Sequence, residues 1–512
     1  MALARAFSVA LVGVTGAVVE VEADLAQGLP GLTMVGLPDT ALAEARDRVR
    51  AAVVNSGLPW PQRKITLGLS PASLPKRGSG FDLAIAAAIL GADAGVVPPD
   101  ALLGRVLVGE LGLDGSVRPV RGVLPAAVTA LQRGFTSVVV PAANLAEARL
   151  LPGVEARGVR TLTDLVCLLV GADYDEPDGD ASGLDGADGR PALDLVDVAG
   201  QVIGRTAVEV AAAGGHHMLL LGPPGSGKTM LAERMTGVLP PLAPEEALEV
   251  TAVHSVAGVL PPSSPLVSRP PFQDPHHTST VSSIVGGGSG IARPGAAALA
   301  HRGVLFLDEA PEFARGVLDA LRQPLESGRL SIRRVGGTAE YPAGFTLLLA
   351  ANPCPCAKEA ERCTCPPETR RRYLARLSGP LLDRIDLHVR LPRITKAEIL
   401  AEDGRGEPSE QVAARVAEAR DRAAARYAGT PWRTNADVPP QEMLRRWRLH
   451  RDVTAPAEQH LDSGELTARG FCRVVRTAWT LADLAGLDAP GTAQVEHALG
   501  FRGLVPAGRR AA

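Results

Sequence analysis

Lysine is scarce in this chain. Its 512 residues include only Lys64, Lys76, Lys228, Lys358 and Lys396. Nearly all positive charge is therefore carried by arginine, whose guanidinium is planar and delocalised, whereas the ammonium group of lysine is a compact point charge. Arginine supplies almost every cationic contact that this chain can make, and a lysine inside a motif marks a place that requires the point charge.

Other features are missing as well. The formal net charge is −3, so no global positive field draws the chain onto nucleic acid, and any such binding must come from local patches. No apolar run is long enough to span a membrane, and the fairly apolar residues 6–19 lack the cleavage site of a signal peptide. We therefore expect no membrane partner and a cytoplasmic, reducing location, where the six cysteines form no disulfide framework.

Length and composition predict several domains. With 512 residues, 46% of them hydrophobic, the chain can form about three domains with their own cores. Short apolar strands alternate with helices in a first α/β domain over residues 1–170. Residues 171–191 are rich in Asp and Gly and predict an acidic, flexible linker. A second α/β core over residues 192–393 and a mostly helical C-terminal domain over residues 394–512 follow.

Residues 222–229 form the most informative segment. They fit the phosphate-loop pattern G-x-x-x-x-G-K-[ST], with an apolar strand expected before them and a helix after them. Glycines let backbone N–H groups cradle a polyphosphate, and the lysine reaches the β- and γ-phosphates. The sequence therefore predicts binding of ATP through a set of loop residues: Gly222, Pro223, Pro224, Gly225, Ser226, Gly227, Lys228 and Thr229.

Residues 303–309 predict the second half of this site. They read as a buried strand that ends in two acids, Asp308 and Glu309. With a phosphate loop in the same chain, Asp308 and the Thr229 hydroxyl are expected to hold Mg²⁺, and Glu309 is expected to polarise the attacking water. Eighty residues separate Lys228 from Asp308, which leaves room for an insertion.

Several further stretches carry a specific resemblance: residues 197–201, 209–216, 275–278, 293–295, 299–309, 352–356 and 378–386. Through them the chain is similar, over nearly its whole length, to the ComM/YifB family of magnesium-chelatase-like AAA+ ATPases. The resemblance implies an ATP-hydrolysing hexameric DNA motor, a helicase that promotes branch migration on single-stranded or branched DNA in recombination or natural transformation. It also implies an AAA+ core with a helix-2 insert and a presensor-1 hairpin, and a C-terminal helical lid.

Two polar residues take their expected roles from this family. Asn352 ends an apolar strand and resembles sensor 1, which orients the attacking water. Arg384 resembles the arginine finger, which reaches the γ-phosphate held by a neighbouring subunit and so implies a ring. The alternative for Arg384 is a surface ion pair with Asp383 or Asp386.

A third role lies in the predicted lid. Residues 466–470 open a helix that is expected to run to about residue 484. Arg469 in its first turn resembles the sensor 2 arginine. Arg473 and Arg476 lie on nearby faces of the same helix and are rivals for that role.

The two family insertions fall at definite places. The helix-2 insert corresponds to residues 276–294, with a glycine-rich loop over residues 286–290. The presensor-1 hairpin corresponds to residues 326–338, a strand, a basic turn and a return strand. Its Arg329, Arg333 and Arg334 are expected to meet DNA phosphates in a ring pore, and the alternative is a subunit contact. His276 and His277 are interpreted as loop structure rather than as metal ligands.

Four of the six cysteines cluster in one loop: Cys354, Cys356, Cys363 and Cys365. Four thiolates in so short a segment can bind Zn²⁺ tetrahedrally, and the alternative is a set of reduced loop thiols. Residues 370–372 and Arg376 follow and form a second basic patch for DNA or subunit contact. Cys167 and Cys472 have apolar neighbours and are expected in the core.

The first domain resembles the ribosomal-protein-S5-like fold of Lon protease domains, through residues 74–82 and 108–120. A protease of that kind needs a Ser–Lys pair. The likeness places Gly80 at the nucleophile, with Ser79 beside it, and no lysine occurs between Lys76 and Lys228. A serine without its base is not activated, so we predict a scaffold rather than a protease.

Two other functions compete with the DNA motor. One is a non-helicase AAA+ remodeller of the magnesium-chelatase motor type, and the other is a regulatory nucleotide switch. The order of domains, with the α/β domain in front of the core and no metal-binding integrin-like domain after it, speaks against the chelatase type. The complete set of ATPase residues speaks for turnover rather than a switch.

Overall fold

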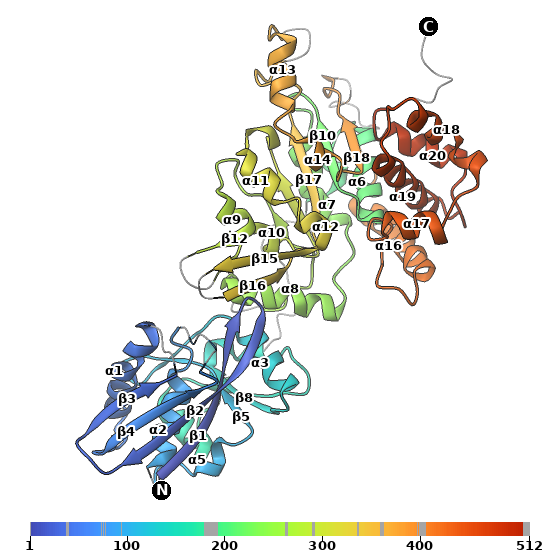
Figure 1. Cartoon of the computed structure of the whole chain (residues 1–512). Helices are drawn as coiled ribbons and strands as arrows, with labels where there is room; N and C mark the ends of the chain where they lie inside the picture. Colours follow the sequence, from blue (N-terminus) through green and yellow to red (C-terminus); the bar gives the residue numbers. More distant parts are fainter. Residues whose placement is uncertain are drawn as a thin grey trace.

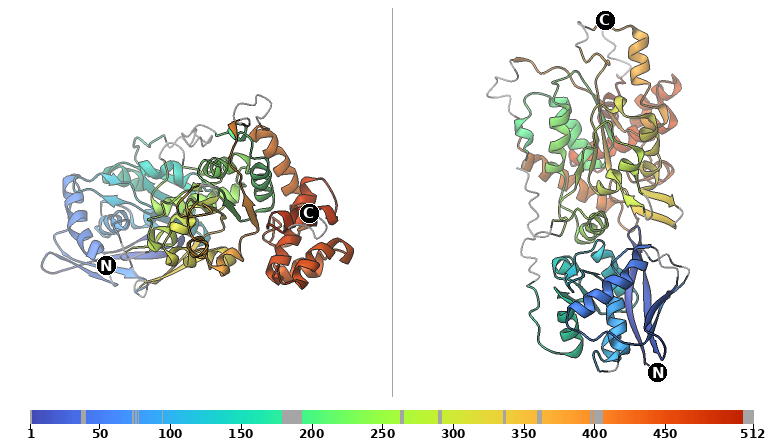
Figure 2. Two further views of the ribbon diagram at one scale, coloured as in Figure 1. Left: turned by 90° about the horizontal axis from the view of Figure 1, so that it is seen from above. Right: turned by 90° about the vertical axis from the view of Figure 1, so that its left-hand side faces the viewer.

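The computed structural model describes residues 2–36, 40–72, 74, 76, 78–93, 95–178, 193–261, 265–288, 292–334, 337–358, 363–396, 398 and 406–504. Three units are arranged one after another, and the central one lies between the N-terminal sheet and the C-terminal helices (Figure 1, Figure 2). No helix of the described residues has the length and apolar character needed to cross a membrane.

The N-terminal unit is built on a mixed seven-stranded sheet of order β3-β4-β2-β1-β5-β8-β9. Helix α2 is buried along its whole length, because its sequence is almost entirely apolar, and it packs on β1 and β2. The elements are β1 (Ala2–Val12), β2 (Thr15–Ala26), β3 (Gly31–Val35), α1 (Thr40–Asn55), β4 (Lys64–Ser70), α2 (Asp82–Ala92), β5 (Arg105–Leu107), β6 (Glu110–Leu111), β7 (Val117–Arg118), α3 (Val123–Gln132), β8 (Ser137–Pro141), α4 (Leu145–Ala148), β9 (Glu155–Val159) and α5 (Leu162–Val170).

The first part of the predicted linker lies against this unit. Arg157 Nη1 is 2.6 Å from the Glu176 carboxylate, and Arg160 Nη1 is 2.9 Å from the Asp175 carboxylate. Tyr174 packs against the core of the sheet. Residues 171–178 are therefore held in place by the N-terminal unit, and the remainder of the predicted linker, 179–191, lies outside the described residues.

The central unit is a parallel five-stranded sheet of order β11-β14-β17-β10-β18. Its three inner strands, β14, β17 and β10, are almost entirely apolar, as expected where both faces of a parallel sheet are covered. Alternate residues point to opposite faces. Met218 and Leu220 join the core beneath α6 and α7, whereas Leu219 joins the core on the other face. The strands are β10 (Met218–Leu221), β11 (Phe272–Gln273), β14 (Val304–Leu307), β17 (Thr346–Ala351) and β18 (Leu387–Arg390).

Helices and two small hairpins surround that sheet, and the prediction of an α/β, multidomain chain is confirmed. The C-terminal helices share the apolar core beneath α6 and α7. The elements are α6 (Val202–Gly214), α7 (Lys228–Val238), α8 (Pro244–Ala257), α9 (Val281–Val285), β12 (Gly286–Gly287), β13 (Arg293–Pro294), α10 (Ala296–Leu299), α11 (Arg315–Ala320), α12 (Pro324–Ser327), β15 (Arg329–Arg334), β16 (Gly337–Pro342), α13 (Pro367–Leu374), α14 (Gly379–Leu382), α16 (Ser409–Arg426), α17 (Pro440–Arg446), α18 (Arg451–Asp462), α19 (Ala468–Leu484) and α20 (Thr492–Gly500).

The N-terminal and central units touch at two places. The Ser255 hydroxyl at the end of α8 donates to the carboxylate of Glu147, and burial raises the pKa of that carboxyl. The turn between β1 and β2 lies against β16, where a Cβ added to Gly13 would come within 2.6 Å of the Glu340 carbonyl oxygen. Strand β16 of the basic hairpin is thus braced by the N-terminal sheet, from its middle toward the hairpin turn.

Candidate nucleotide-binding site

The phosphate loop connects β10 to α7 at the carboxyl edge of the parallel sheet. Gly225 and Gly227 have φ of +74° and +81°, which residues with a side chain rarely adopt. A Cβ on Gly222 would lie 2.6 Å from the Ser226 hydroxyl and 2.9 Å from the Leu391 carbonyl oxygen. The loop can therefore turn its N–H groups inward at the N-terminus of α7, a site suited to an anion.

Lys228 bends back over this loop. Its Nζ donates to the carbonyl oxygens of Gly222 and Pro223, at 2.7 and 3.0 Å, and to Asn352 Oδ1 at 3.1 Å. Burial lowers the pKa of Lys228, against the opposing charges of Asp308 and Glu309. The ammonium group thus lies between the loop and the end of β17, where it can pair with phosphates.

Thr229 and Asp308 meet although 79 positions separate them in sequence. The Thr229 hydroxyl donates to the Asp308 carboxylate at 2.9 Å. A hydroxyl and a carboxylate oxygen beside a phosphate cradle are the hard ligands that Mg²⁺ prefers. This pair therefore fits the metal that accompanies a nucleoside triphosphate.

Glu309 begins the turn after β14 in a left-handed conformation, with φ of +50°. Its backbone N–H donates to Asp308 Oδ1 at 2.8 Å, and its carboxylate is half exposed. Asn352 directly follows the neighbouring strand β17, and its side chain lies toward Lys228. Strand order thus brings both acids, the amide and the loop to one edge of the sheet, the usual ligand-binding edge of open α/β sheets.

His277 was not recognised from the sequence as part of this site. Its Nδ1 lies 3.5 Å from Glu309 Oε2, and the His276 ring lies tilted against its own ring with centroids 4.1 Å apart. The interpretation of His277 as loop structure alone is therefore incomplete, because an acid that is distant in sequence is close in space. The sequence held no signal for this contact, because it depends on the pairing of β11, the strand before His277, with β14.

Arg384 lies at the opposite edge of the sheet. Asp386, two residues further on, accepts the His217 N–H at the amino end of β10. The four residues of β10 span about 13 Å between that edge and the phosphate loop. The ion-pair partner of Arg384 is Glu326 rather than Asp383 or Asp386, so the predicted alternative pairing is wrong. Arg384 is 11% exposed and does not reach the loop of its own chain.

The arginines of α19 lie at this same edge. Arg473 donates to the Asp383 carbonyl oxygen and to the Asp386 carboxylate, both at 2.6 Å, and that charge holds the pKa of Asp386 well below its usual range despite burial. Arg476 is buried and donates to the Val438 carbonyl oxygen. Both rivals are thus engaged within the chain, whereas Arg469, one helical turn before Arg473, is exposed.

The predicted hairpin is present as the antiparallel pair β15 and β16. Ile332 points inward and packs beside the β12–β13 insert, while three side chains are exposed and have no ion-pair partner among the described residues. These are Arg329, Arg333 and Arg334. Of the glycine-rich loop, residues 289 and 290 lie outside the described part of the chain.

The four clustered cysteines converge in space. Their Sγ atoms all lie within 4.8 Å of one another. Cys354 Sγ is 3.4 Å from Cys356 Sγ and 3.3 Å from Cys363 Sγ. Tetrahedral Zn²⁺ with bonds of about 2.3 Å would separate its sulfur ligands by about 3.8 Å, so the group fits such an ion. Cys365 completes the set, and Cys167 and Cys472 lie elsewhere.

The N-terminal unit holds no serine–lysine pair among the described residues. The Ser79 hydroxyl donates to the Glu110 carboxylate. Lys76 is buried and donates to the carbonyl oxygens of Gly36 and Pro71, and burial lowers its pKa. Its ammonium group is therefore committed to backbone carbonyls and does not activate Ser79.

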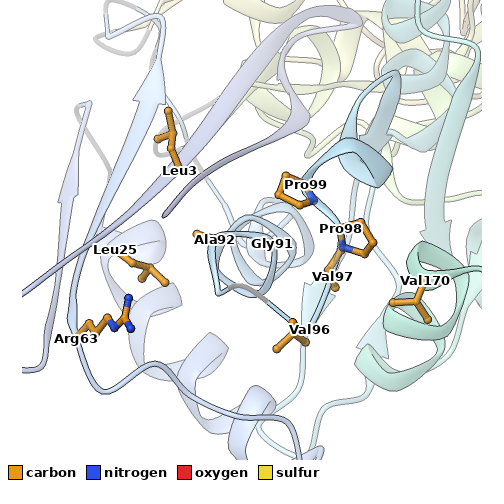
Figure 3. Close-up of a pocket in the computed structure, with 11 residues that line it drawn as sticks. Leu3, Leu25, Arg63, Gly91, Ala92, Val96, Val97, Pro98, Pro99 and Val170 are labelled. Atoms are coloured by element: carbon orange, nitrogen blue, oxygen red, sulfur yellow. The ribbon is translucent and has the colours of Figure 1, made fainter. Parts of the chain in front are cut away.

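A separate hollow of about 800 Å³ lies in the N-terminal unit (Figure 3). Leu3, Leu25, Val97 and Val170 contribute to its apolar wall, and among the described residues Arg63 is the one charged side chain that lines it. No described residue places a carboxylate, thiol or imidazole in its wall, so that wall offers none of the chemistry found at the phosphate loop.

Family models of magnesium chelatase cover the chain in three parts. Residues 21–144 match subunit ChlI of Mg-chelatase, residues 194–399 match magnesium chelatase, subunit ChlI, and residues 406–502 match the C-terminal part of that subunit. A weak likeness to the Lon protease of Mycolicibacterium smegmatis, 28% identical, covers 33% of this chain and 22% of that protein.

Relatives match over the full length. An uncharacterised protein of Mycobacterium tuberculosis is 54% identical over 98% of this chain and 99% of its own. YifB of Escherichia coli is 39% identical over 98% of both chains. The competence protein ComM of Haemophilus influenzae is 39% identical over 99% of this chain and 98% of its own. This chain therefore belongs to the ComM/YifB family of magnesium-chelatase-like AAA+ proteins.

Proposed function

We propose that this protein is an ATP-hydrolysing hexameric DNA motor, a helicase that promotes branch migration in recombination or natural transformation. The observation that carries the proposal is the division of one ATPase site between two edges of a sheet. The loop, both acids and Asn352 lie at the carboxyl edge, and Arg384 lies at the amino edge. Full-length similarity to a competence protein supports DNA as the substrate.

At the carboxyl edge, each side chain has a distinct task. Lys228 pairs with the β- and γ-phosphates of ATP while the loop N–H groups hold the remaining oxygens. Thr229 and Asp308 supply oxygens to Mg²⁺, which neutralises phosphate charge when bound. Glu309 accepts a proton from the attacking water, and Asn352 orients that water.

At the amino edge, the arginines serve a neighbouring subunit. Because about 13 Å of strand separates Arg384 from its own phosphate loop, its guanidinium can act only on ATP held by another copy. Arg469, exposed at the start of α19 on this same edge, would act on that neighbour too, as a sensor 2 residue in trans. A head-to-tail ring follows from such a contact, and six subunits follow from the family.

DNA contacts are assigned to the hairpin. Arg329, Arg333 and Arg334 are exposed and have no partner among the described residues, so their charges are available to phosphates. The N-terminal unit braces the hairpin from behind and acts as a scaffold. Single-stranded or branched DNA in the ring pore would be gripped by a basic turn from each subunit.

We also assign a structural Zn²⁺ to Cys354, Cys356, Cys363 and Cys365. Thiolates are soft ligands, and these four lie close enough together to surround one ion tetrahedrally. Such a site favours zinc over Mg²⁺ or Ca²⁺. A motor that acts on DNA works in the cytoplasm, and that compartment keeps thiols reduced, as zinc binding requires. The metal would close the loop directly after Asn352.

ATPase rates with and without single-stranded and branched DNA test this function, together with movement of a synthetic four-way junction. We expect DNA to raise the rate and ATP to drive the junction. Turnover that no DNA changes, with a stationary junction, would favour the remodeller of the magnesium-chelatase motor type instead. ATP that is bound but never hydrolysed would favour a nucleotide switch.

A further inference from the structure

One helix projects from the end of the molecule that is farthest from the N-terminal sheet (Figure 1, Figure 2). It is α13, and it carries Arg370, Arg371 and Arg372. All three side chains are exposed, and none has a hydrogen-bond or ion-pair partner among the described residues. We call the described segments 353–358 and 363–376 together the arginine arm.

The carboxyl end of the arm is tied to the strand that bears the catalytic acids. Tyr373 is buried, with 6% of its surface exposed. Arg376 Nη1 lies 3.0 Å from the Pro311 carbonyl oxygen and 3.0 Å from the Glu312 carboxylate. Pro311 follows Glu309 by two residues, in the turn that begins at Glu309. Movement of α13 is therefore mechanically connected to Glu309.

The amino end of the arm is tied to the other half of the site. Cys354 follows Asn352 by two residues and is buried. Its Sγ lies 3.3 Å from that of Cys363, which begins the described segment leading into α13. A metal held by the four thiolates would make this connection rigid, because it fixes both ends of the loop at one point. The arm thus rests on the ends of β14 and β17, where Glu309 and Asn352 emerge.

We propose that the arginine arm binds the phosphate backbone of DNA and that its two attachments convey this contact to Glu309 and Asn352. The inference rests on the proposed function, for which it supplies a second DNA contact and a route by which DNA regulates hydrolysis. The arm and the hairpin leave the sheet from different edges. In the proposed ring, DNA would therefore be contacted at two positions along the ring axis, once by the hairpin and once by the arginine arm.

The arrangement of the arginines favours DNA over a neighbouring subunit. Three consecutive helical residues fan over about 200° of the helix circumference, since each residue turns the helix by about 100°. A flat protein interface uses residues three or four apart on one face. Adjacent guanidinium groups on α13 point in different directions. They can therefore contact phosphates on both sides of this protein helix, as when the helix lies along a DNA strand or in a DNA groove.

The test is a triple variant, Arg370→Gln with Arg371→Gln and Arg372→Gln, in the full-length protein. Its control is Arg445→Gln with Arg446→Gln and Arg448→Gln, three exposed arginines near the end of α17. Both variants remove the same amount of charge.

Duplex DNA affinity is measured across a salt series. We expect the arm variant to flatten the slope of log K against log salt by about 2 to 3, because each phosphate that a cation neutralises accounts for about 0.9 of that slope. The control should keep the slope of the wild type.

The coupling is tested with Arg376→Gln, which cuts the attachment to Glu312 and leaves the three arm arginines in place. We expect its salt slope to match the wild type and its stimulation by DNA to fall. Unchanged stimulation would overturn the coupling. Zinc content and thermal unfolding, measured on every variant, show that each is folded.

The possible results distinguish a failure of the proposed arginine-arm contact from a failure of the proposed DNA motor. If the wild type does not bind DNA, the proposed motor fails. If the wild type binds DNA and the arm variant keeps its affinity and slope, the arm is not a DNA contact although the proposed motor stands. If the arm variant instead loses its nucleotide-dependent ring, as measured by sedimentation, the arginines meet a neighbouring subunit and the inference is overturned.

Discussion

The guanidinium of Arg384 pairs with the carboxylate of Glu326, 58 positions earlier in the chain. Glu326 lies in α12, directly before the basic hairpin, so the candidate arginine finger is attached to the base of the candidate DNA contact. A hairpin that moves when it grips DNA would pull Glu326 away and free Arg384 for the neighbouring site. In the proposed motor, this ion pair would connect DNA contact at the hairpin to ATP hydrolysis in the neighbouring subunit.

Substitution of Glu326 should weaken that connection. With Glu326→Gln we expect the rate without DNA to rise by a factor of about 1.4 to 5, because an ion pair exposed on one side contributes about 0.2–1 kcal/mol. Stimulation by DNA should fall accordingly, as measured by steady-state ATPase assays. Glu418→Gln, which breaks an exposed pair on α16, is the control. A lower rate without DNA would show that Glu326 supports Arg384 rather than restrains it.

Mixing two inactive variants tests whether Arg384 acts in trans. Arg384→Ala and Lys228→Ala should each abolish turnover, since a finger is worth about 10³–10⁵ in rate. In mixed rings, an Arg384→Ala subunit still has its loop, and its Lys228→Ala neighbour still supplies the finger. Random mixing in a head-to-tail ring gives about a quarter of the interfaces an intact site. ATPase activity that returns on mixing supports the shared site, and none returns if Arg384 acts within its own chain.

Glu309→Gln should separate ATP binding from hydrolysis. The loop, Lys228 and Thr229 remain, so affinity for ATP should stay near that of the wild type. Loss of the base should slow the chemical step by about 10²–10⁴. Single-turnover hydrolysis and equilibrium binding of labelled ATP measure the two quantities. Retained turnover would refute the role of Glu309.

The zinc assignment predicts about one equivalent of metal per chain by elemental analysis. Cys354→Ser or Cys363→Ser should lose the metal, whereas Cys167→Ser, which lies outside the cluster, should keep it. Cobalt exchanged into the protein should give the ligand-field absorption of a tetrahedral thiolate site. Metal that persists in both cluster variants would place the ion elsewhere.

The amino edge of the sheet should be sensitive to acid. Burial lowers the pKa of His217 to about 4, and its Nδ1 accepts the Leu347 N–H at 3.1 Å. The folded state holds the His217 imidazole in its neutral form, whereas the unfolded chain protonates it more readily. The contribution of His217 to the free energy of unfolding is therefore complete above about pH 6.5 and declines as pH falls toward 4. The loss is at most about 3 kcal/mol. His217→Asn, which keeps an acceptor, should reduce this decline in urea unfolding series, and exposed His450→Asn should not.

Much of the site was predictable from sequence because its chemistry is local. Gly225, Gly227 and Lys228 are required at fixed spacing by the backbone of one loop, and the apolar runs before Asp308 and Asn352 predicted strands buried on both faces. The contact of His277 with Glu309 was not predictable, since it depends on which strand pairs with β14. The pairing of Arg384 with Glu326 likewise depends on the packing of α12.

The order of residues alone specifies which groups this protein can use: a phosphate loop, two acids after a strand, an amide after another, and four thiols within a dozen residues. Where these groups act depends on folding. The order β14-β17-β10 brings Lys228, Asp308 and Asn352 to one edge, and the length of β10 keeps Arg384 at the other. Motifs follow from spacing along the backbone, whereas the edge that each residue occupies follows from strand pairing between distant segments.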